Sequence, residues 1–320
     1  MMENKTELLR VNHLKKYFNT PKGLLYAVDD INFSINKGET LGIVGESGCG
    51  KSTLGRTILR LHEPTSGEVI FEGRNIVKAN RNDMKKLRNK MQIIFQDPYE
   101  SLNPRMTVSQ AIQAPLLIQN QYKASDKVGL QKKTKEMMDL VGLSNRLVNT
   151  YPHELDGGRR QRIGIARALA LNPAFIVCDE PVSALDVSIQ AQVLNLMQDL
   201  QDQLGLTYMF ITHDLSVVKH LSNQIAVMYL GQMVEKGTPE QLFSNPCHPY
   251  TKALLSAIPI PDPDIKMNRV MLEGEITSPI NVEPGCRFAK RCVYATEKCK
   301  CNMELKEIEP GHFVSCQMVQ

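Results

Sequence analysis

The sequence predicts an α/β fold with a mostly parallel sheet, an antiparallel β layer and an inserted helical subdomain. Short apolar runs alternate with turns over residues 8–44, which is typical of antiparallel strands. Runs typical of buried strands then recur at 91–96, 174–178 and 206–211, and strands that alternate with helices favour a parallel sheet. Residues 107–147 have a helical pattern with Lys-rich solvated faces, which predicts the inserted subdomain.

The composition is that of an ordinary globular protein. The 320 residues are 42% hydrophobic and 22% charged, and a net charge of +4 argues against a dedicated nucleic-acid binder. No run approaches the ~18 apolar residues that a membrane-spanning helix needs. Residues 1–7 are polar and of mixed charge, so we expect neither a secretory signal nor an anchor, and hence a cytoplasmic protein. Its eight cysteines are then expected to be reduced or metal-bound.

Changes in pattern along the chain predict its domains. The main domain is expected over residues 1–242, with the helical subdomain at about 100–170 within it. Residues 243–320 are richer in Pro and Cys and are expected to form a separate C-terminal extension. Before the strand at 206–211, an amphipathic helix is predicted, with one apolar stripe formed by Ile189, Val193, Leu196, Leu200 and Leu204.

Residues 45–53 fit the phosphate-binding pattern G-x-x-x-x-G-K-[ST] between an apolar strand at 40–44 and a helical segment at 52–59. The loop consists of Gly45, Glu46, Ser47, Gly48, Cys49, Gly50, Lys51, Ser52 and Thr53. Glycines allow backbone N–H groups to surround a polyphosphate, and the N-terminus of the following helix favours negative charge. We expect Lys51 to reach the β- and γ-phosphates and the Ser52 hydroxyl to hold Mg²⁺. The loop predicts a nucleotide site.

Polar residues at the ends of further strands add hydrolytic chemistry to this loop. Asp179 ends a buried strand and is placed to hold the Mg²⁺ shell, while Glu180 is expected to orient or deprotonate the attacking water. Gln96 ends another strand and is expected to complete the Mg²⁺ and water shell. His213 follows the strand at 206–211 and is expected to contact the γ-phosphate. Together they predict a site that hydrolyses a nucleoside triphosphate.

Five of the eight cysteines lie after residue 285, with the spacing C-x5-C-x6-C-x-C-x14-C. They are Cys286, Cys292, Cys299, Cys301 and Cys316. The paired C-x2-C units of structural zinc sites are absent from this spacing. Four thiolates gathered from loops suit an iron–sulfur cluster, with zinc as the alternative and a cytosolic disulfide the least favoured reading.

In chain order, these motifs resemble an ABC-transporter ATPase subunit, a P-loop NTPase, over nearly the whole chain. The motifs are the phosphate loop, Gln96, residues 155–159, Asp179 with Glu180, residues 183–186 and His213. Two further stretches, 96–106 and 248–255, resemble the oligopeptide/dipeptide (and nickel) importer branch, in particular the second of its two paired ATPases. The resemblance implies ATP hydrolysis that drives uptake of di- or oligopeptides, with a nickel or metal-chelate importer as the alternative. A non-transport ABC ATPase of DNA repair or translation is less favoured, because such chains usually carry a long coiled-coil insertion or a second ATPase domain.

The resemblance also implies partners and ligand roles. Two ATPase subunits would pair head to tail, each ATP lying between one phosphate loop and the other subunit's signature motif. Two membrane permeases and, indirectly, an extracytoplasmic solute-binding protein complete such an importer, which places the chain on the cytoplasmic face of the membrane without nucleic acid. Tyr17, by itself either an adenine-stacking ring or a half-buried strand aromatic, becomes the adenine-stacking residue. Gln96 and the segment after it would meet the coupling helices of the permeases.

The C-terminal segment resembles that of peptide-importer ATPases, some of which carry a [4Fe–4S] cluster. By that resemblance Cys286, Cys292, Cys299 and Cys316 are the ligands and Cys301 is the spare cysteine. The cluster's role is then structural or regulatory, since ATP hydrolysis needs no electron transfer.

The signature motif departs from the family pattern Leu-Ser-Gly-Gly-Gln, because residues 155–159 read Leu-Asp-Gly-Gly-Arg. By the resemblance Asp156, Gly157 and Gly158 face the γ-phosphate bound by the partner subunit. Asp156 is a good helix N-cap, but its carboxylate repels a phosphate, which Arg159 and the helix dipole offset in part. We therefore hypothesise a weakened ATP site at this signature; the alternative is a tolerated variant. A homodimer would carry the change twice, which favours a heterodimer.

Overall fold

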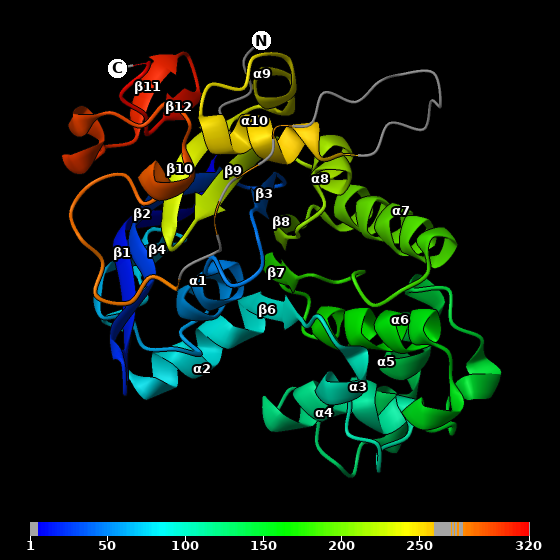
Figure 1. The fold of residues 1–320 in the computed structure, drawn as a ribbon. Coiled ribbons are helices and arrows are strands. Elements are labelled where there is room, and N and C mark those ends of the chain that lie inside the picture. The colour runs from blue at the N-terminus through cyan, green and yellow to red at the C-terminus, as the bar shows by residue number, and fades with distance from the viewer. Residues whose placement is uncertain (1–5, 259–269, 271, 273, 275–277, 320) are drawn as a thin grey trace, which may run out of the picture. The chain divides into compact units, whose positions relative to one another are not determined.

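The computed structural model describes residues 6–258, 270, 272, 274 and 278–319 (Figure 1). Residues 1–5, which carry most of the expectation about a signal or anchor, lie outside the described residues. The chain divides into two units, Met1–Val77 with Phe210–Gln320 and Lys78–Met209, and each is described by itself. In the described part of the chain, no helix combines the length and apolar character needed to cross a membrane.

The first unit begins with an antiparallel sheet in the order β2-β1-β4-β5. Its strands are β1 (Glu7–Thr20), β2 (Gly23–Asn36), β4 (Ser66–Phe71) and β5 (Arg74–Asn75). Ile31, Phe33 and Ile35 of β2 are buried while Ser34 between them is exposed, which is the two-residue period of a strand with one core face. This sheet is the predicted antiparallel layer.

A second set of strands in the first unit carries the phosphate loop. Strand β3 (Thr40–Val44), buried throughout, pairs in parallel with β9 (Gln224–Tyr229). Strand β10 (Gln232–Gly237) runs antiparallel to β9 and pairs on its other side with β12 (His312–Val314), which pairs with β11 (Lys306–Glu309). The C-terminal segment thus adds two antiparallel strands to this set.

The helices of the first unit connect these strands. They are α1 (Lys51–Ile58), α8 (Leu215–Leu221), α9 (Pro239–Ser244) and α10 (Pro249–Ser256), with 3₁₀ turns at Ala289–Arg291 and Glu297–Lys300. The described residues after 243 belong to the same unit as the N-terminal strands, and within this unit β12 pairs with β10. The expected boundary at residue 243 stays a prediction.

The second unit pairs two parallel strands, β6 (Met91–Ile94) and β7 (Phe175–Asp179), and surrounds them with helices (Figure 1). The helices are α2 (Arg81–Lys90), α3 (Pro98–Ser101), α4 (Val108–Ile118), α5 (Lys127–Leu140), α6 (Gly157–Leu169) and α7 (Val187–Leu204), with 3₁₀ turns at Asn145–Leu147 and Pro152–Glu154. Strand β8 (Thr207–Ile211) crosses the boundary between the units. The predicted α/β fold with its helical block is confirmed.

Helix α7 corrects one sequence prediction. Its fully buried residues are Val193, Met197 and Leu200, whereas Leu204 of the predicted stripe is 49% exposed. The helix ends at Gly205, whose positive φ of 64° provides a left-handed cap, so Leu204 lies in the last turn beyond the covered face. The unbranched Met197 takes the core position expected for Leu196.

Candidate functional site

The phosphate loop connects β3 to α1, and its glycines are required by close backbone contacts. A Cβ atom at Gly45 would lie 2.2 Å from the carbonyl oxygen of Met228, and one at Gly50 would lie 2.0 Å from that of Ala27. Gly50 has a positive φ of 104°, a conformation that favours glycine, and α1 begins directly after it. The loop is therefore held tightly between β2 and β9.

Lys51 lies within this loop with only 4% of its surface exposed. Its Nζ donates hydrogen bonds to the carbonyl oxygens of Gly45 at 2.7 Å and Glu46 at 3.0 Å. Burial raises the pKa of the neighbouring Cys49 thiol, so Cys49 serves the loop as a small apolar residue. The ammonium group is thus fixed among the loop carbonyls, where a phosphate ligand would meet it.

Tyr17 lies on β1 beside the same loop. Its ring pairs with that of Tyr26, with 4.5 Å between centroids, and Ala27 after Tyr26 supports Gly50. The Tyr17 hydroxyl donates a hydrogen bond to Asp29, and burial together with this acceptor raises the pKa of Tyr17. The half-buried strand position is therefore observed, and adenine stacking stays a prediction.

The second unit brings two of the predicted catalytic residues together. Gln96 Nε2 donates a hydrogen bond to Glu180 Oε2 at 3.0 Å. Glu180 follows β7 directly and has a left-handed φ of 46°, which is unusual for a non-glycine residue and typical of functional sites. Asp179 is 1% exposed at the end of β7. The structure thus places Gln96 beside Glu180, while their roles toward water and Mg²⁺ stay predictions.

His213 and the predicted Mg²⁺ ligands lie on different elements of the fold. His213 is exposed after β8, where Asp214 begins α8 by accepting the Ser216 N–H at 2.8 Å. Ser52 opens α1 in the first unit, whereas Gln96 and Asp179 belong to the second unit. A site shared by Ser52, Gln96 and Asp179 therefore stays a prediction.

Asp156 caps the signature helix α6 as the sequence predicts. Its Oδ1 accepts the Arg159 N–H at 2.7 Å, and its Oδ2 lies 3.4 Å from Arg159 Nε. Both side chains are about half exposed, so this ion pair contributes little to stability. Arg159 does partly offset the carboxylate that replaces the usual serine.

Helix α6 also holds the segment after Gln96. The Arg160 guanidinium lies 3.4 Å from the ring centroid of Tyr99, and Arg167 donates to the Ser101 carbonyl oxygen. Tyr99 is nevertheless 62% exposed. An exposed aromatic side chain on a fixed segment is suited to contact a partner protein.

Four of the five C-terminal cysteines line one small pocket, together with His248, Phe288 and Met303. They are Cys286, Cys292, Cys299 and Cys316, the four that the family resemblance implies, whereas Cys301 is exposed and outside the pocket lining. Burial raises the pKa of Cys286 to about 11, and the other three thiols add to the increase. Burial also raises the pKa values of Cys292 and Cys316.

A set of four clustered thiols fits a thiolate-bound metal group. Because the pKa values of Cys286, Cys292 and Cys316 are raised, a bound metal must displace protons from these three thiols. These residues would supply four sulfur ligands and enclose the group in an apolar pocket that includes Phe288.

Comparisons with known proteins show the family of this chain. The ABC transporter family model matches residues 28–183, and the oligopeptide/dipeptide transporter C-terminal region matches 234–299. The putative oligopeptide transport ATP-binding protein YkfD of Bacillus subtilis is 52% identical over 97% of this chain and 95% of its own length. The chain belongs to the oligopeptide/dipeptide branch of the ABC transporter ATPases. The dipeptide transport ATP-binding protein DppF of Haemophilus influenzae is 49% identical to this ABC ATPase over 98% of both chains.

A solved structure supports the same assignment. The dimeric ATP-binding cassette MJ0796 bound to ADP and phosphate matches with a TM-score of 0.66 and 29% identity. The match covers 72% of this chain and 99% of that chain. ATP and Mg²⁺ are therefore the expected ligands of this ABC ATPase, and membrane permeases are its expected partners.

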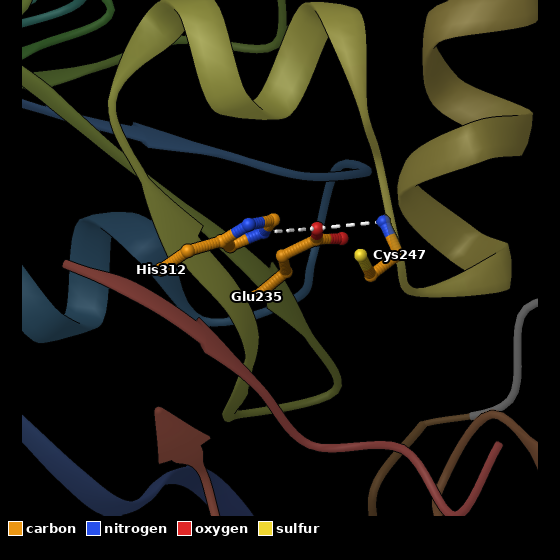
Figure 2. Close-up of side chains that lie close together, drawn as sticks. All are labelled: Glu235, Cys247 and His312. Carbon is orange, nitrogen blue, oxygen red and sulfur yellow. Dashed lines mark hydrogen bonds and ion pairs between the residues drawn. The ribbon is translucent and has the colours of Figure 1, made fainter. Parts of the chain in front are cut away.

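Three residues of the ABC ATPase that sequence reasoning did not assign lie close together: the buried Glu235 and His312 and the half-buried Cys247 (Figure 2). Glu235 of β10 accepts hydrogen bonds from the backbone N–H groups of Cys247 and His248, at 2.8 Å and 2.9 Å, and its Oε1 lies 2.8 Å from His312 Nε2. Glu235 and His312 are fully buried. Donor atoms of Glu235, Cys247 and His312 lie within 4.8 Å of one another, the spacing of a metal site. Because the carboxylate already accepts these hydrogen bonds, we interpret it as a structural link between β10, the start of α10 and β12.

Proposed function

We propose that this chain hydrolyses ATP to energise the import of di- or oligopeptides through membrane permeases. The observation that carries the proposal is the combination of the ABC motifs with the C-terminal region matched at residues 234–299. The relatives named for oligopeptide or dipeptide transport, which match nearly the full chain, support it. In this function Lys51 binds the phosphates, Ser52, Gln96 and Asp179 hold Mg²⁺, and Glu180 activates water.

The expected assembly is a head-to-tail pair of ATPase subunits at the cytoplasmic face of the membrane. Pairing is supported by the solved relative described as a dimer bound to ADP and phosphate. Each ATP then lies between the phosphate loop of one subunit and the signature motif of the other. The segment around Tyr99, exposed and supported by Arg160, is the proposed contact for the permeases. The altered signature at Asp156 favours a heterodimer with a second ABC ATPase.

ATP turnover by the reconstituted complex tests this function. We expect binding protein loaded with peptide to stimulate turnover and binding protein loaded with nickel to leave it at the basal level. Stimulation by nickel alone would replace the peptide assignment with metal-chelate import. If basal turnover is intact but neither ligand stimulates it, the proposed import of peptides would be wrong. The non-transport ABC ATPase would then be the favoured alternative.

The signature variant gives a prediction of its own. If the Asp156 carboxylate repels the γ-phosphate of the partner's ATP, then Asp156→Ser raises turnover of the paired ATPases about two- to tenfold. Serine also caps a helix N-terminus, so α6 is preserved. Steady-state ATPase assays on the paired subunits measure the change. Unchanged turnover would make Asp156 a tolerated variant.

We further propose that Cys286, Cys292, Cys299 and Cys316 hold a [4Fe–4S] cluster, with zinc as the alternative ligand. Support comes from their common pocket and from the exposure of Cys301. Cys286→Ser is expected to abolish the visible absorbance and most of the bound iron, because a hydroxyl is a poor substitute for thiolate. Anaerobic purification followed by iron, sulfide and zinc analysis measures this.

The chain supplies a matched control for the cysteine prediction. Cys301→Ser should keep wild-type iron content, because its side chain lies outside the pocket lining. Zinc without sulfide in the wild type would select the alternative. Equal loss of metal in both variants would contradict the assignment of ligands.

A further inference from the structure

Two arginines next to the pocket cysteines make buried contacts at or near the phosphate loop, Arg291 with Glu46 and Arg287 with Asp29. Arg291 directly precedes Cys292, and its guanidinium binds both carboxylate oxygens of Glu46, at 2.8 Å and 3.2 Å. The Arg291 and Glu46 side chains are only 9% and 21% exposed, and the hydrogen bond to Glu46 is the main reason that the pKa of Arg291 is raised. Glu46 is the second residue of the phosphate loop, 245 positions away in the sequence. A bidentate, largely desolvated guanidinium–carboxylate pair of this kind fixes both side chains in one geometry.

The same loop residue is held at its backbone. The Glu46 N–H donates a hydrogen bond to the Tyr250 hydroxyl at 2.8 Å. Phe288, 1% exposed and between the two arginines in sequence, packs against Tyr250 and Tyr229 with ring centroids 5.4 Å and 5.3 Å away. The C-terminal segment therefore contacts the side chain of Glu46 through Arg291. It also packs, through Phe288, against Tyr250, the residue that accepts the Glu46 N–H.

Arg287, directly after Cys286, reaches Asp29, which binds the proposed adenine-stacking residue Tyr17. Its guanidinium pairs with Asp29, the residue that accepts the Tyr17 hydroxyl, and donates to the Leu230 carbonyl oxygen. The next residue, Gly231, donates its N–H to the Cys49 carbonyl oxygen of the phosphate loop at 2.8 Å. Arg287 is 5% exposed in its side chain, so these contacts are made inside the protein.

We propose that Arg287 and Arg291 are positioning residues that couple the four-cysteine pocket to ATP binding. Each arginine is covalently adjacent to a cysteine of the pocket, and each braces a different part of the nucleotide site. When the pocket binds its metal group, the segment 286–292 is fixed and the loop is held ready for ATP. When the group is lost, the segment that carries both arginines is no longer fixed and ATP binds more weakly. Because coupling is reciprocal, ATP should in turn slow the loss of the group.

The first arm of the test isolates the arginine contact in the full-length chain. Arg291→Met is expected to raise the KM and the Kd for ATP about tenfold with little change in kcat. Arg291→Lys should restore part of the affinity, because it keeps the charge but not the fork. Glu46→Gln combined with Arg291→Met should be no worse than Arg291→Met alone. Additive losses, or a fall in kcat instead of a rise in KM, would overturn the positioning role.

Lys290→Met is the matched control, because this exposed cation directly precedes Arg291 in the chain and is not part of the lining of the four-cysteine pocket. It should leave the Kd for ATP at the wild-type value. An equal rise in Kd would assign the effect to general disruption of the segment. Thermal unfolding without nucleotide identifies variants that fail to fold. If Arg291→Met fails to fold, the Kd of Arg291→Lys is compared with that of the wild type instead.

The second arm tests the coupling and uses wild-type chain reconstituted with iron and sulfide or stripped with a chelator. The Kd for ATP is expected to be several-fold lower in the reconstituted protein, and this difference should disappear in Arg291→Met. Equal affinities of the two wild-type forms would overturn the coupling. The proposal rests on the nucleotide and cysteine sites proposed above, but both arms measure ATP binding, so their outcome is independent of which solute is transported.

Discussion

Glu180→Gln is expected to lower the kcat for ATP hydrolysis about 100-fold or more, because a positioned general base contributes about that much. The glutamine keeps the shape of the side chain but cannot accept a proton from water. ATP affinity should remain at the wild-type level, since the phosphates are bound by the loop at Lys51. The measurement is steady-state turnover with a separate nucleotide-binding titration.

The structure explains why this one carboxylate is singled out. Glu180 has a left-handed backbone at the end of β7, and its carboxylate accepts the Gln96 amide at 3.0 Å. Glu136→Gln is the control, because that glutamate is 56% exposed on α5 and pairs with Lys133 on the surface. A normal kcat in Glu180→Gln would contradict the catalytic role, as would a comparable fall in Glu136→Gln.

The parts of the fold and site that could be predicted from the sequence are those set by residues close together in the chain. The turn between β3 and α1 depends on glycines and a lysine that are adjacent in the chain, so its pattern is readable directly. Gln96 and Glu180 are 84 residues apart, and both were predicted as site residues because each was expected to follow a buried strand. In the structure Glu180 follows β7 directly, whereas β6 ends at Ile94, two residues before Gln96. Periodicity predicted the buried strands β3, β7 and β8 and the helices within residues 107–147, whereas β9 to β12 were not predicted.

The contacts that were not predicted join distant parts of the chain. The Arg291–Glu46 pair spans 245 residues and the Glu235–His312 contact spans 77. No spacing rule links such residues, because the loops between them set the approach. Strands β11 and β12 were missed for a related reason: they are only four and three residues long, and β12 pairs with β10, which is distant in the sequence. The arginines beside Cys286 and Cys292 were visible in the sequence, but their partners were not.

Lys51→Met is expected to raise the Kd for ATP roughly 10- to 100-fold, because a hydrogen bond to a charged group contributes about 1.5–3 kcal/mol. Methionine has a similar length and suits a position that is 4% exposed. The substitution removes the Nζ that binds the carbonyl oxygens of Gly45 and Glu46, so thermal unfolding without nucleotide must be measured beside the binding titration.

Lys37→Met is the control for this substitution, because Lys37 is exposed in the turn between β2 and β3. It should bind ATP as the wild type does. Wild-type affinity in folded Lys51→Met would contradict the phosphate-binding role of Lys51. Lys51 binds the carbonyl oxygen of Glu46 and Arg291 binds its carboxylate, so one loop residue is held from two sides. The two variants should therefore weaken ATP binding by different routes: Lys51→Met removes the charge that meets the phosphates, whereas Arg291→Met only loosens the loop that presents it.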